Sequence, residues 1–367
     1  MTQPPLTPLV DSLPATVPFV GPEAQERQSG KPFAARLGAN ESVFGPSPKA
    51  IAALQAAASE AWMYGDPEAL ELRQAIAAHH SVPVEAVMTG EGIDGLFGTA
   101  VRLFVEPGVS VVTSAGAYPT FAYHVVGFGG RLVTVPYQGD YEDPEALLEA
   151  AKREKARLVF LANPDNPMGS WHPAAVVQQL LDGLPDDCLL MLDEAYSDFA
   201  PAEALPAMQI ERTNLLRFRT FSKARGLAGL RVGYVIGAPA VINCFNKVRN
   251  HFGLGRLSQV GALAALQDQD YLRSVVQQVA NARDSIAGIA ERVGLSALPS
   301  ATNFVAIDCG RDGAFAKQVL EGLLARGVFV RMPGVAPLNR CIRVSAGRPD
   351  DLALLEAALT QTLEELK

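Results

Sequence analysis

The chain is poor in cysteine and carries no excess of positive charge. Its 367 residues include four cysteines, Cys188, Cys244, Cys309 and Cys341, which lie far apart and form no C-x-x-C pair. A zinc site would need clustered cysteine and histidine ligands, so we expect no metal site but four reduced, mostly buried thiols in a cytoplasmic protein. The 39 acidic residues outnumber the 31 basic ones, for a net charge of −8, which argues against nucleic acids and anionic membranes as partners.

Long apolar segments and a leader sequence are also missing. The longest uncharged stretch, residues 107–130, is interrupted by Pro119, His124 and five glycines, whereas a membrane-spanning helix needs about 20 mostly apolar residues. The first 19 residues contain neither a basic region nor an unbroken apolar run. We therefore expect no signal peptide and no membrane partner.

Short apolar runs alternate with amphipathic stretches after residue 46, whereas residues 1–40 are rich in proline and lack periodicity. This pattern predicts an extended arm followed by a mostly parallel sheet that helices cover on both faces. The expected strands are 86–88, 110–113, 132–135, 158–161, 189–192, 215–218 and 232–236. The expected helices between them are 67–80, 92–104, 119–126, 144–152 and 173–181.

The C-terminal part of the chain has a different pattern. It is helical from about residue 239 to 291 and then mixes helices and strands, which predicts a second, smaller α/β unit. We expect three parts: an N-terminal arm at 1–45, a large domain at 46–250 and a small domain at 251–367. The elements expected in the last part are 303–307, 314–326, 328–330, 341–345 and 350–366.

A glycine-rich turn, GEGIDG at residues 90–95, follows an expected strand and opens an expected helix. It fits G-x-G-x-x-G, but a dinucleotide site also needs an acidic residue about 20 positions later. No Asp or Glu occurs between residues 107 and 139, so a nicotinamide oxidoreductase is disfavoured. Such a turn can still present backbone N–H groups to an anion; a plain strand-to-helix turn explains it equally well.

Three further motifs follow apolar strands, where ligands bind in parallel sheets. ANPDNPMG, residues 162–169, brings two asparagines to a strand end, although a simple turn also accounts for it. DEAY begins with Asp193, which must be solvated, paired, functional or a helix cap. TFSK ends in Lys223, which stands near Thr220, Ser222 and Arg231. Two hydroxyls and a guanidinium near an amine fit a phosphate site, and the amine fits a Schiff-base nucleophile.

These motifs, in this order, resemble the fold-type I pyridoxal-phosphate enzymes. The likeness is to the class I/II aminotransferases, in particular to the histidinol-phosphate aminotransferases, and it extends from near Leu37 to near Arg343. The combination of N-P-x-N-P, D-E-A-Y and S-K-x-R-G-x-A-G-x-R-x-G is highly specific. The resemblance implies an α/β fold, with a mostly parallel seven-stranded sheet in a large domain and a smaller C-terminal α/β domain. It also implies a homodimer, with the arm on the small domain and the partner subunit.

The resemblance assigns residues to pyridoxal 5'-phosphate. Lys223 matches the lysine that bonds the cofactor covalently, and Asp193 matches the carboxylate that binds the ring nitrogen. Tyr196 and Asn166 match the hydrogen-bond partners of the 3′ oxygen, and Phe121 matches the aromatic side chain that stacks on the ring. The catalytic set is therefore Lys223, Asp193 and Tyr196.

Further matches concern the phosphate and the substrate. Tyr64 matches a tyrosine that reaches the phosphate across the dimer interface, and Arg343 matches the arginine that binds the substrate carboxylate. Asn40 matches an arm residue near the substrate, and Arg331 is a candidate for a second anionic group or a plain surface residue. The residues matched to the phosphate are the backbone of Gly92, Ile93 and Asp94 and the side chains of Thr220, Ser222 and Arg231.

The implied reaction moves an amino group between a primary amino compound, either histidinol phosphate or an aromatic amino acid, and a 2-oxo acid such as 2-oxoglutarate. The family usually has a tyrosine where this chain has Phe19 and a small residue where it has Ile93. We therefore expect histidinol phosphate to be a poorer substrate than at least one aromatic amino acid. Two alternatives remain open, a decarboxylase of the same fold similar to threonine-phosphate decarboxylase and a regulatory protein that binds the cofactor without turnover.

Overall fold

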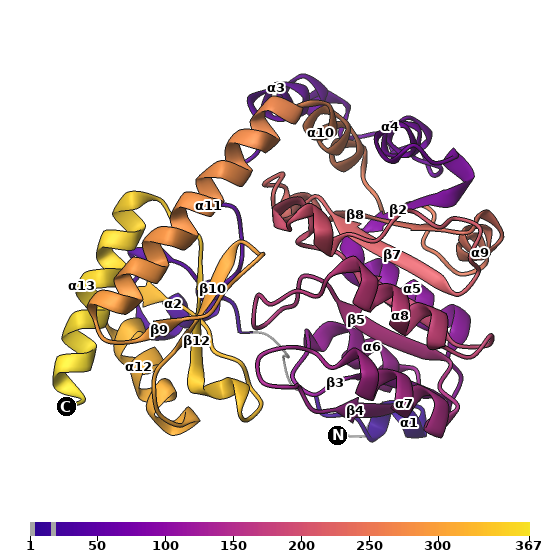
Figure 1. The fold of residues 1–367 in the computed structure, drawn as a ribbon. Helices are drawn as coiled ribbons and strands as arrows, with labels where there is room; N and C mark the ends of the chain where they lie inside the picture. Colours follow the sequence, from indigo (N-terminus) through magenta and orange to yellow (C-terminus); the bar gives the residue numbers. More distant parts are fainter. Residues whose placement is uncertain (1–3, 16–19) are drawn as a thin grey trace.

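Two α/β units stand side by side and are linked by a long helix, α11 (Gln269–Arg292), as Figure 1 shows. The computed structural model describes residues 4–15 and 20–367. The larger unit contains a seven-stranded sheet, and the smaller one contains a three-stranded sheet. None of the helices in the described residues is long and apolar enough to cross a membrane.

The large sheet has the strand order β2-β8-β7-β6-β5-β3-β4. Strand β8 runs antiparallel to β2 and to β7, and the other neighbouring strands run parallel. The predicted mostly parallel sheet of seven strands is thus confirmed. Its strands are β2 (Val87–Glu91), β3 (Ser110–Ser114), β4 (Arg131–Val135), β5 (Leu158–Ala162), β6 (Leu189–Asp193), β7 (Leu215–Thr220) and β8 (Val232–Gly237).

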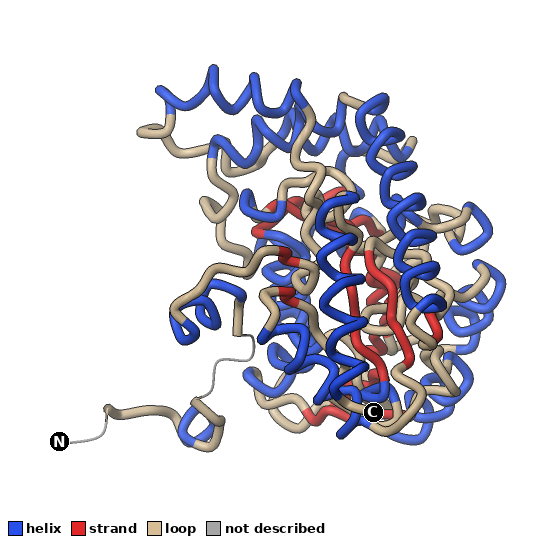
Figure 2. Tube along the Cα trace, turned by 90° about the vertical axis from the view of Figure 1, so that its left-hand side faces the viewer, coloured by secondary structure: helices blue, strands red, loops and turns tan. Residues whose placement is uncertain are grey.

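Successive side chains of each strand point to opposite faces of the sheet. In the inner strands β3, β5 and β6 every residue is buried, so both faces are covered there. In β5, Phe160 packs into the core under α5 and α6, whereas Leu161 packs into the core under α7 and α8. Figure 2 shows the strands enclosed by helices on either side. The helices of the large unit are α3 (Pro48–Ala57), α4 (Leu70–His80), α5 (Gly92–Phe104), α6 (Pro119–Gly127), α7 (Pro144–Glu154), α8 (Ala174–Gly183), α9 (Pro239–Cys244) and α10 (Arg256–Gln267).

The small unit is built on β10 (Phe304–Asp308), which pairs antiparallel with β12 (Cys341–Ser345) and β9 (Ser296–Ala297). Helices α11, α12 (Gly313–Ala325) and α13 (Pro349–Glu365) supply the rest of its core. The short helical turns of the chain are η1 (Ala58–Glu60), η2 (Val84–Ala86), η3 (Ser197–Phe199), η4 (Ala202–Ala204), η5 (Ala228–Leu230), η6 (Phe245–Lys247) and η7 (Leu338–Arg340).

The N-terminal segment differs from the extended arm that the sequence predicts, because it contains α1 (Pro8–Asp11) and α2 (Pro22–Ser29). Pro22 is the one buried residue of α2, so its sequence shows no apolar period. Arg36 holds this helix through ion pairs with Glu23 at 2.8 Å and Glu26 at 2.6 Å. The strand that follows, β1 (Ala35–Arg36), pairs with β11 (Val328–Phe329) of the small unit.

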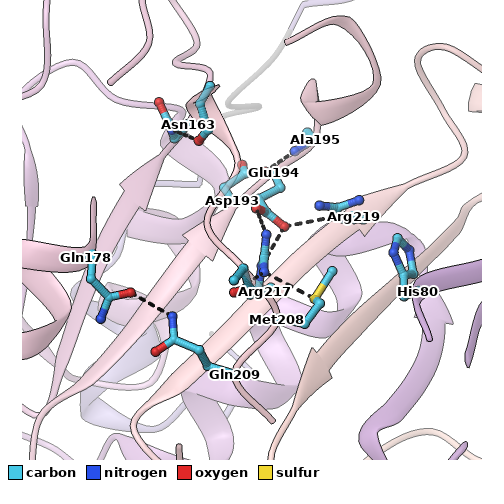
Figure 3. Close-up of polar contacts among 12 residues, drawn as sticks. His80, Asn163, Gln178, Asp193, Glu194, Ala195, Met208, Gln209, Arg217 and Arg219 are labelled. Carbon is cyan, nitrogen blue, oxygen red and sulfur yellow. Dashed lines mark hydrogen bonds and ion pairs between the residues drawn. The ribbon is translucent and has the colours of Figure 1, made fainter. Parts of the chain in front are cut away.

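A buried ion triad joins the ends of β6 and β7 (Figure 3). The carboxylate of Glu194 accepts hydrogen bonds from Arg217 and from Arg219, the latter at 2.9 Å. Although burial opposes ionisation, the two guanidinium groups lower the pKa of Glu194 to about 2. Arg217 also donates to the Ala207 carbonyl at 3.0 Å and contacts the Met208 sulfur at 3.1 Å. The triad fixes the strand that ends in Asp193 against the strand that leads to Lys223.

Removing one partner of this triad should strongly destabilise the fold. Arg217→Met should lower the free energy of unfolding by about 3–5 kcal/mol, because it leaves part of a buried charge without compensation. Arg153→Met is the matched control, since the Arg153 side chain is 62% exposed in its pair with Glu154, and it should have no measurable effect. Chemical denaturation of both variants tests this, and equal stability of the two would contradict it.

Candidate active site

A cavity of about 510 Å³ opens at the carboxyl ends of β5, β6 and β7, between the two units. Its wall includes Asn40 from the N-terminal segment, Asp193 and Lys223 from the large unit, and Arg331 and Arg343 from the small unit. A second cavity of about 500 Å³ lies between α11 and α13. Because most of the predicted site residues line the first cavity and none lines the second, the first is the candidate active site.

Lys223 lies in the turn after β7, and its amine reaches the N-terminal segment. Its Nζ donates to the backbone carbonyl of Asn40 at 3.2 Å, and Asn303 Nδ2 donates to the same oxygen at 3.0 Å. Burial, aided by the positive charge of Arg343, lowers the pKa of Lys223 to about 8. About a tenth of this amine is therefore unprotonated at pH 7, far more than for an ordinary lysine, and a nucleophile or proton acceptor requires this form.

Asn40 adopts a left-handed backbone conformation, with φ of 55°. Its side-chain amide donates to the Tyr196 hydroxyl at 3.0 Å, and its backbone amide donates to Ser345 Oγ at 3.0 Å. The segment around it docks on the turn after Lys223, where a Cβ at Gly226 would lie 2.2 Å from the Gly45 carbonyl oxygen. Glycine at position 226 therefore makes this docking possible.

Asp193 is the last residue of β6, and its carboxylate is almost fully buried. The Ala195 amide donates to Asp193 Oδ1 at 2.9 Å. Burial raises the pKa of Asp193 to about 7, and the nearby charge of Lys223 acts in the opposite direction. A cationic group placed in the cavity against this carboxylate would stabilise its ionised form.

Asn166 and Arg343 meet across the cavity. Arg343 donates from Nη1 to Asn166 Oδ1 and from Nη2 to the Gly38 carbonyl at 3.4 Å, while Asn166 Nδ2 lies 3.5 Å from the Tyr196 hydroxyl. The Nε of Arg343 is buried and has no hydrogen-bond partner among the described residues. Arg331 is paired with Arg343 through the backbone, and its Nη2 donates to the Val20 carbonyl at 2.9 Å. Two guanidinium groups thus stand together at this end of the cavity.

The other end of the cavity lies at the N-terminus of α5. Gly92 has φ of +71°, and a Cβ there would lie 2.7 Å from Nη2 of Arg231. Close to it, the hydroxyls of Thr220 and Ser222 are joined by a hydrogen bond of 3.0 Å. Backbone N–H groups at a helix N-terminus, with hydroxyls and a guanidinium, form a site for a phosphate. The structure brings all the residues matched to the phosphate within one chain together here.

Phe121 does not lie in the cavity, which corrects the expectation that it stacks on the cofactor. Its ring is buried in the core of the large unit and stacks on Phe160 with ring centroids 4.5 Å apart. Phe121 is the third residue of α6, so it faces the sheet, whereas Tyr118 precedes the helix and lines the cavity. The sequence signal for Tyr118 was its place in AYPTF, residues 117–121, where it is the aromatic residue directly before the helix.

Tyr64 lies outside the cavity of its own chain. Its side chain is 79% exposed, and its ring is 5.0 Å from that of Phe252. Trp62, two residues earlier, is 82% exposed. This geometry fits a residue that acts on another subunit. Phe19, on which the substrate expectation depended, lies outside the described residues.

The comparisons with known proteins agree with this geometry. The sequence profile of the aminotransferase class I and II family matches residues 35–359. The chain belongs to this family. A histidinol-phosphate aminotransferase from Anaeromyxobacter sp. is 37% identical over 345 residues, which cover 93% of this chain and 94% of that protein. One from Moorella thermoacetica is 33% identical over 340 residues, covering 92% and 87% of the two chains.

A solved structure extends the likeness to the whole chain. The crystal structure of histidinol-phosphate aminotransferase from Sinorhizobium meliloti, in complex with pyridoxal-5'-phosphate, matches with a TM-score of 0.97 and 53% identity. The match covers 100% of this chain and 99% of that one. The resemblance to the aminotransferases and the α/β fold expected from it are therefore confirmed.

The lowered pKa of Lys223 predicts selective labelling of this lysine. A buried amine with a pKa of about 8 becomes unprotonated, and hence reactive, at lower pH than an ordinary surface lysine does. In cofactor-free protein, the labelling rate of Lys223 with a small amine reagent should be half-maximal near pH 8. Peptide mass spectrometry across a pH series measures this rate, with the 65%-exposed Lys49 as internal control. Identical pH profiles for Lys223 and Lys49 would contradict the prediction.

Proposed function

We propose that this chain is a pyridoxal-phosphate-dependent aminotransferase that uses histidinol phosphate as amino donor and a 2-oxo acid, such as 2-oxoglutarate, as acceptor. One arrangement carries the proposal: the Lys223 amine shares a cavity with a buried carboxylate, Asp193, and with the phosphate site at the N-terminus of α5. The decarboxylase and the regulatory protein are not favoured, because the relatives named above are aminotransferases.

The residues in the cavity fit the cofactor that the Sinorhizobium meliloti structure contains. The carboxylate of Asp193 is buried and suits a protonated ring nitrogen. The N-terminus of α5, with Thr220, Ser222 and Arg231, suits a phosphate, since helix dipole, hydroxyls and guanidinium all favour an anion. Tyr118 lines the cavity and suits packing against an aromatic ring. When bound, pyridoxal phosphate supplies an electron sink for the carbon that carries the amino group.

The side chains of the site then have separate tasks. Asp193 stabilises positive charge on the ring nitrogen, and Tyr196 and Asn166 orient the ring through its oxygen. Lys223 accepts and returns a proton at the amino-bearing carbon, because its lowered pKa makes the neutral amine more available near neutral pH than that of an ordinary lysine. Asn40 holds the Lys223 amine through its carbonyl and the Tyr196 hydroxyl through its side chain.

The two arginines at the far end of the cavity select an anionic substrate. Arg343 offers a planar pair of donors, which matches a carboxylate or a phosphate, and its Nε has no protein partner among the described residues. Arg331 stands beside it. Histidinol phosphate has a phosphate for this end of the cavity, and the acceptor has a carboxylate. An aromatic amino acid, which also has a carboxylate, is the second candidate donor.

Activity measurements decide between these donors. With 2-oxoglutarate as acceptor, kcat/KM for histidinol phosphate should exceed kcat/KM for phenylalanine. This reverses the expectation drawn from Phe19, because two adjacent guanidinium groups favour a doubly charged phosphate over a single carboxylate. Lys223→Ala should abolish transamination of both donors and the trapping of cofactor by borohydride. A ratio in favour of phenylalanine would support the second candidate, and borohydride labelling of another lysine would overturn the assignment of Lys223.

We further propose a cytoplasmic homodimer in which residues 1–45 form an arm, 46–250 a large domain and 251–367 a small domain. One helix departs from this division, because α10 lies within 251–367 but packs on α3 and α4 of the large unit. The exposure of Tyr64 supports the dimer, because a tyrosine on the surface of one subunit can complete the phosphate site of the other. The pairing of β1 with β11 supports an arm that packs on the small domain.

A subunit-mixing experiment tests the shared site. Lys223→Ala and Tyr64→Ala chains should each have little activity alone, but mixing them should restore some sites that contain both native residues. Recovered activity after subunit exchange, measured with light scattering for the oligomeric state, checks this. A fully active monomer, or no recovery after demonstrated exchange, would count against the dimer.

A further inference from the structure

Three buried carboxyl groups gather at the carboxyl ends of the sheet strands, beside the proposed cofactor site. Glu142 and Asp165 join Asp193 there, with exposed fractions of 1%, 2% and 5% respectively. The amide of Ala162 donates to Glu142 Oε1 at 2.9 Å, and Ala162 is the register partner of Asp193 in the sheet. Asp165 follows three residues after Ala162. The site thus concentrates potential negative charge where water is largely excluded.

The groups that hold the Glu142 side chain are neutral. Besides the Ala162 amide, the hydroxyl of Ser114 lies 2.6 Å from Oε2. His172 faces the same residue, with its Nε2 donating to the Glu142 backbone carbonyl at 2.8 Å. Burial lowers the pKa of His172, so this ring is also uncharged at neutral pH.

The other two carboxyl groups have cations near them. Burial raises the pKa of Asp165 and of Asp193 to about 7. The charge of Arg343 opposes this shift at Asp165, and the charge of Lys223 opposes it at Asp193. Asp165 also accepts hydrogen bonds from the Tyr137 hydroxyl at 2.9 Å and from the Met168 amide at 3.0 Å.

Among the described residues, Glu142 faces these two carboxyl groups and Tyr137, and no cation forms an ion pair with it. Burial, together with the negative charges of Asp165 and Asp193, raises the pKa of Glu142 well above its ordinary value. A buried charge without a partner is costly, and a carboxyl group in that position takes up a proton. The Ser114 hydroxyl lies 2.6 Å from Oε2, and because a hydroxyl can accept as well as donate, it is in reach of a proton on that oxygen.

We propose that Glu142 is a neutral carboxylic acid in the folded enzyme, with its proton between Oε2 and Ser114 Oγ, so that any negative charge of the cluster lies on Asp193 and Asp165, each of which has a cation near it. An ionised Glu142 would repel the Asp193 carboxylate and favour its protonation. Glu142 is therefore a positioning residue that acts through the charge of Asp193. This last step rests on the proposed function of Asp193, whereas the neutral state of Glu142 does not.

Infrared spectroscopy of the pyridoxal-phosphate-loaded protein tests the neutral state directly. The difference spectrum between wild type and Glu142→Gln at neutral pH should contain the carbonyl stretch of a protonated carboxylic acid. Glu149→Gln is the matched control, because Glu149 is exposed on α7, and its difference spectrum should contain carboxylate bands. Carboxylate bands in the Glu142→Gln spectrum would overturn the proposal.

The pH dependence of stability gives a second, independent readout. A carboxyl group whose pKa is raised by folding stabilises the protein below its unfolded-state value, 4.5 for Glu142, and this contribution disappears as the pH rises toward the folded-state pKa. Between these values, the folded-to-unfolded ratio of wild type should fall relative to that of Glu142→Gln by up to about tenfold per pH unit. Denaturation at a series of pH values, again with Glu149→Gln as control, measures the ratio.

Parallel stability curves for wild type and Glu142→Gln would show that Glu142 gains no proton on folding and would overturn the proposal. Neither readout depends on turnover, so its outcome is separate from that of the proposed function. The Asp193→Asn variant separates the two proposals, because it should lower transamination activity if Asp193 binds the ring nitrogen. Full activity of Asp193→Asn would contradict the role of Asp193 and leave the neutral state of Glu142 standing.

Discussion

A sheet that is covered on both faces has room for polar side chains at the ends of its strands, and this constraint decides where the chemistry lies. Strands β5 and β6 are buried along their whole length, so their charged and amide side chains follow or terminate them. Asn166, Asp193 and Lys223 all come from such ends. Because β5, β6 and β7 run parallel, their carboxyl ends meet at one edge, and these side chains share one cavity.

Two adjacent carboxylates at this edge show how strongly the surroundings control charge. Glu194 is held by two arginines, which lower its pKa to about 2 although burial opposes ionisation. Asp193, one residue earlier, has its pKa raised to about 7 by burial. Glu194 is therefore ionised whatever occupies the cavity. The ionised form of Asp193, in contrast, is stabilised when a cationic group lies in the cavity. A structural role and a proposed functional role thus belong to neighbouring residues at the end of β6.

The cavity is complete because distant segments close it. Asn40, from the N-terminal segment, contacts both Lys223 and Tyr196, and Arg343, from the small unit, contacts Asn166. Because these contacts bring Arg343 near Lys223, the positive charge of Arg343 contributes to the lowered pKa of Lys223. The reactivity of the lysine therefore depends on how the two units and the N-terminal segment are assembled.

The sequence alone determined the seven strands, their mostly parallel direction and the residues that end them, because apolar runs and turn motifs are local signals, whereas the order of the strands in the sheet came from the structure. It also placed Lys223, Asp193 and Asn166 at strand ends. The tertiary structure decided that Phe121 enters the core while Tyr118 lines the cavity. It also showed that Glu142 lies beside the register partner of Asp193. Side-chain direction and the charge of a buried group depend on packing between distant segments, which no local pattern records.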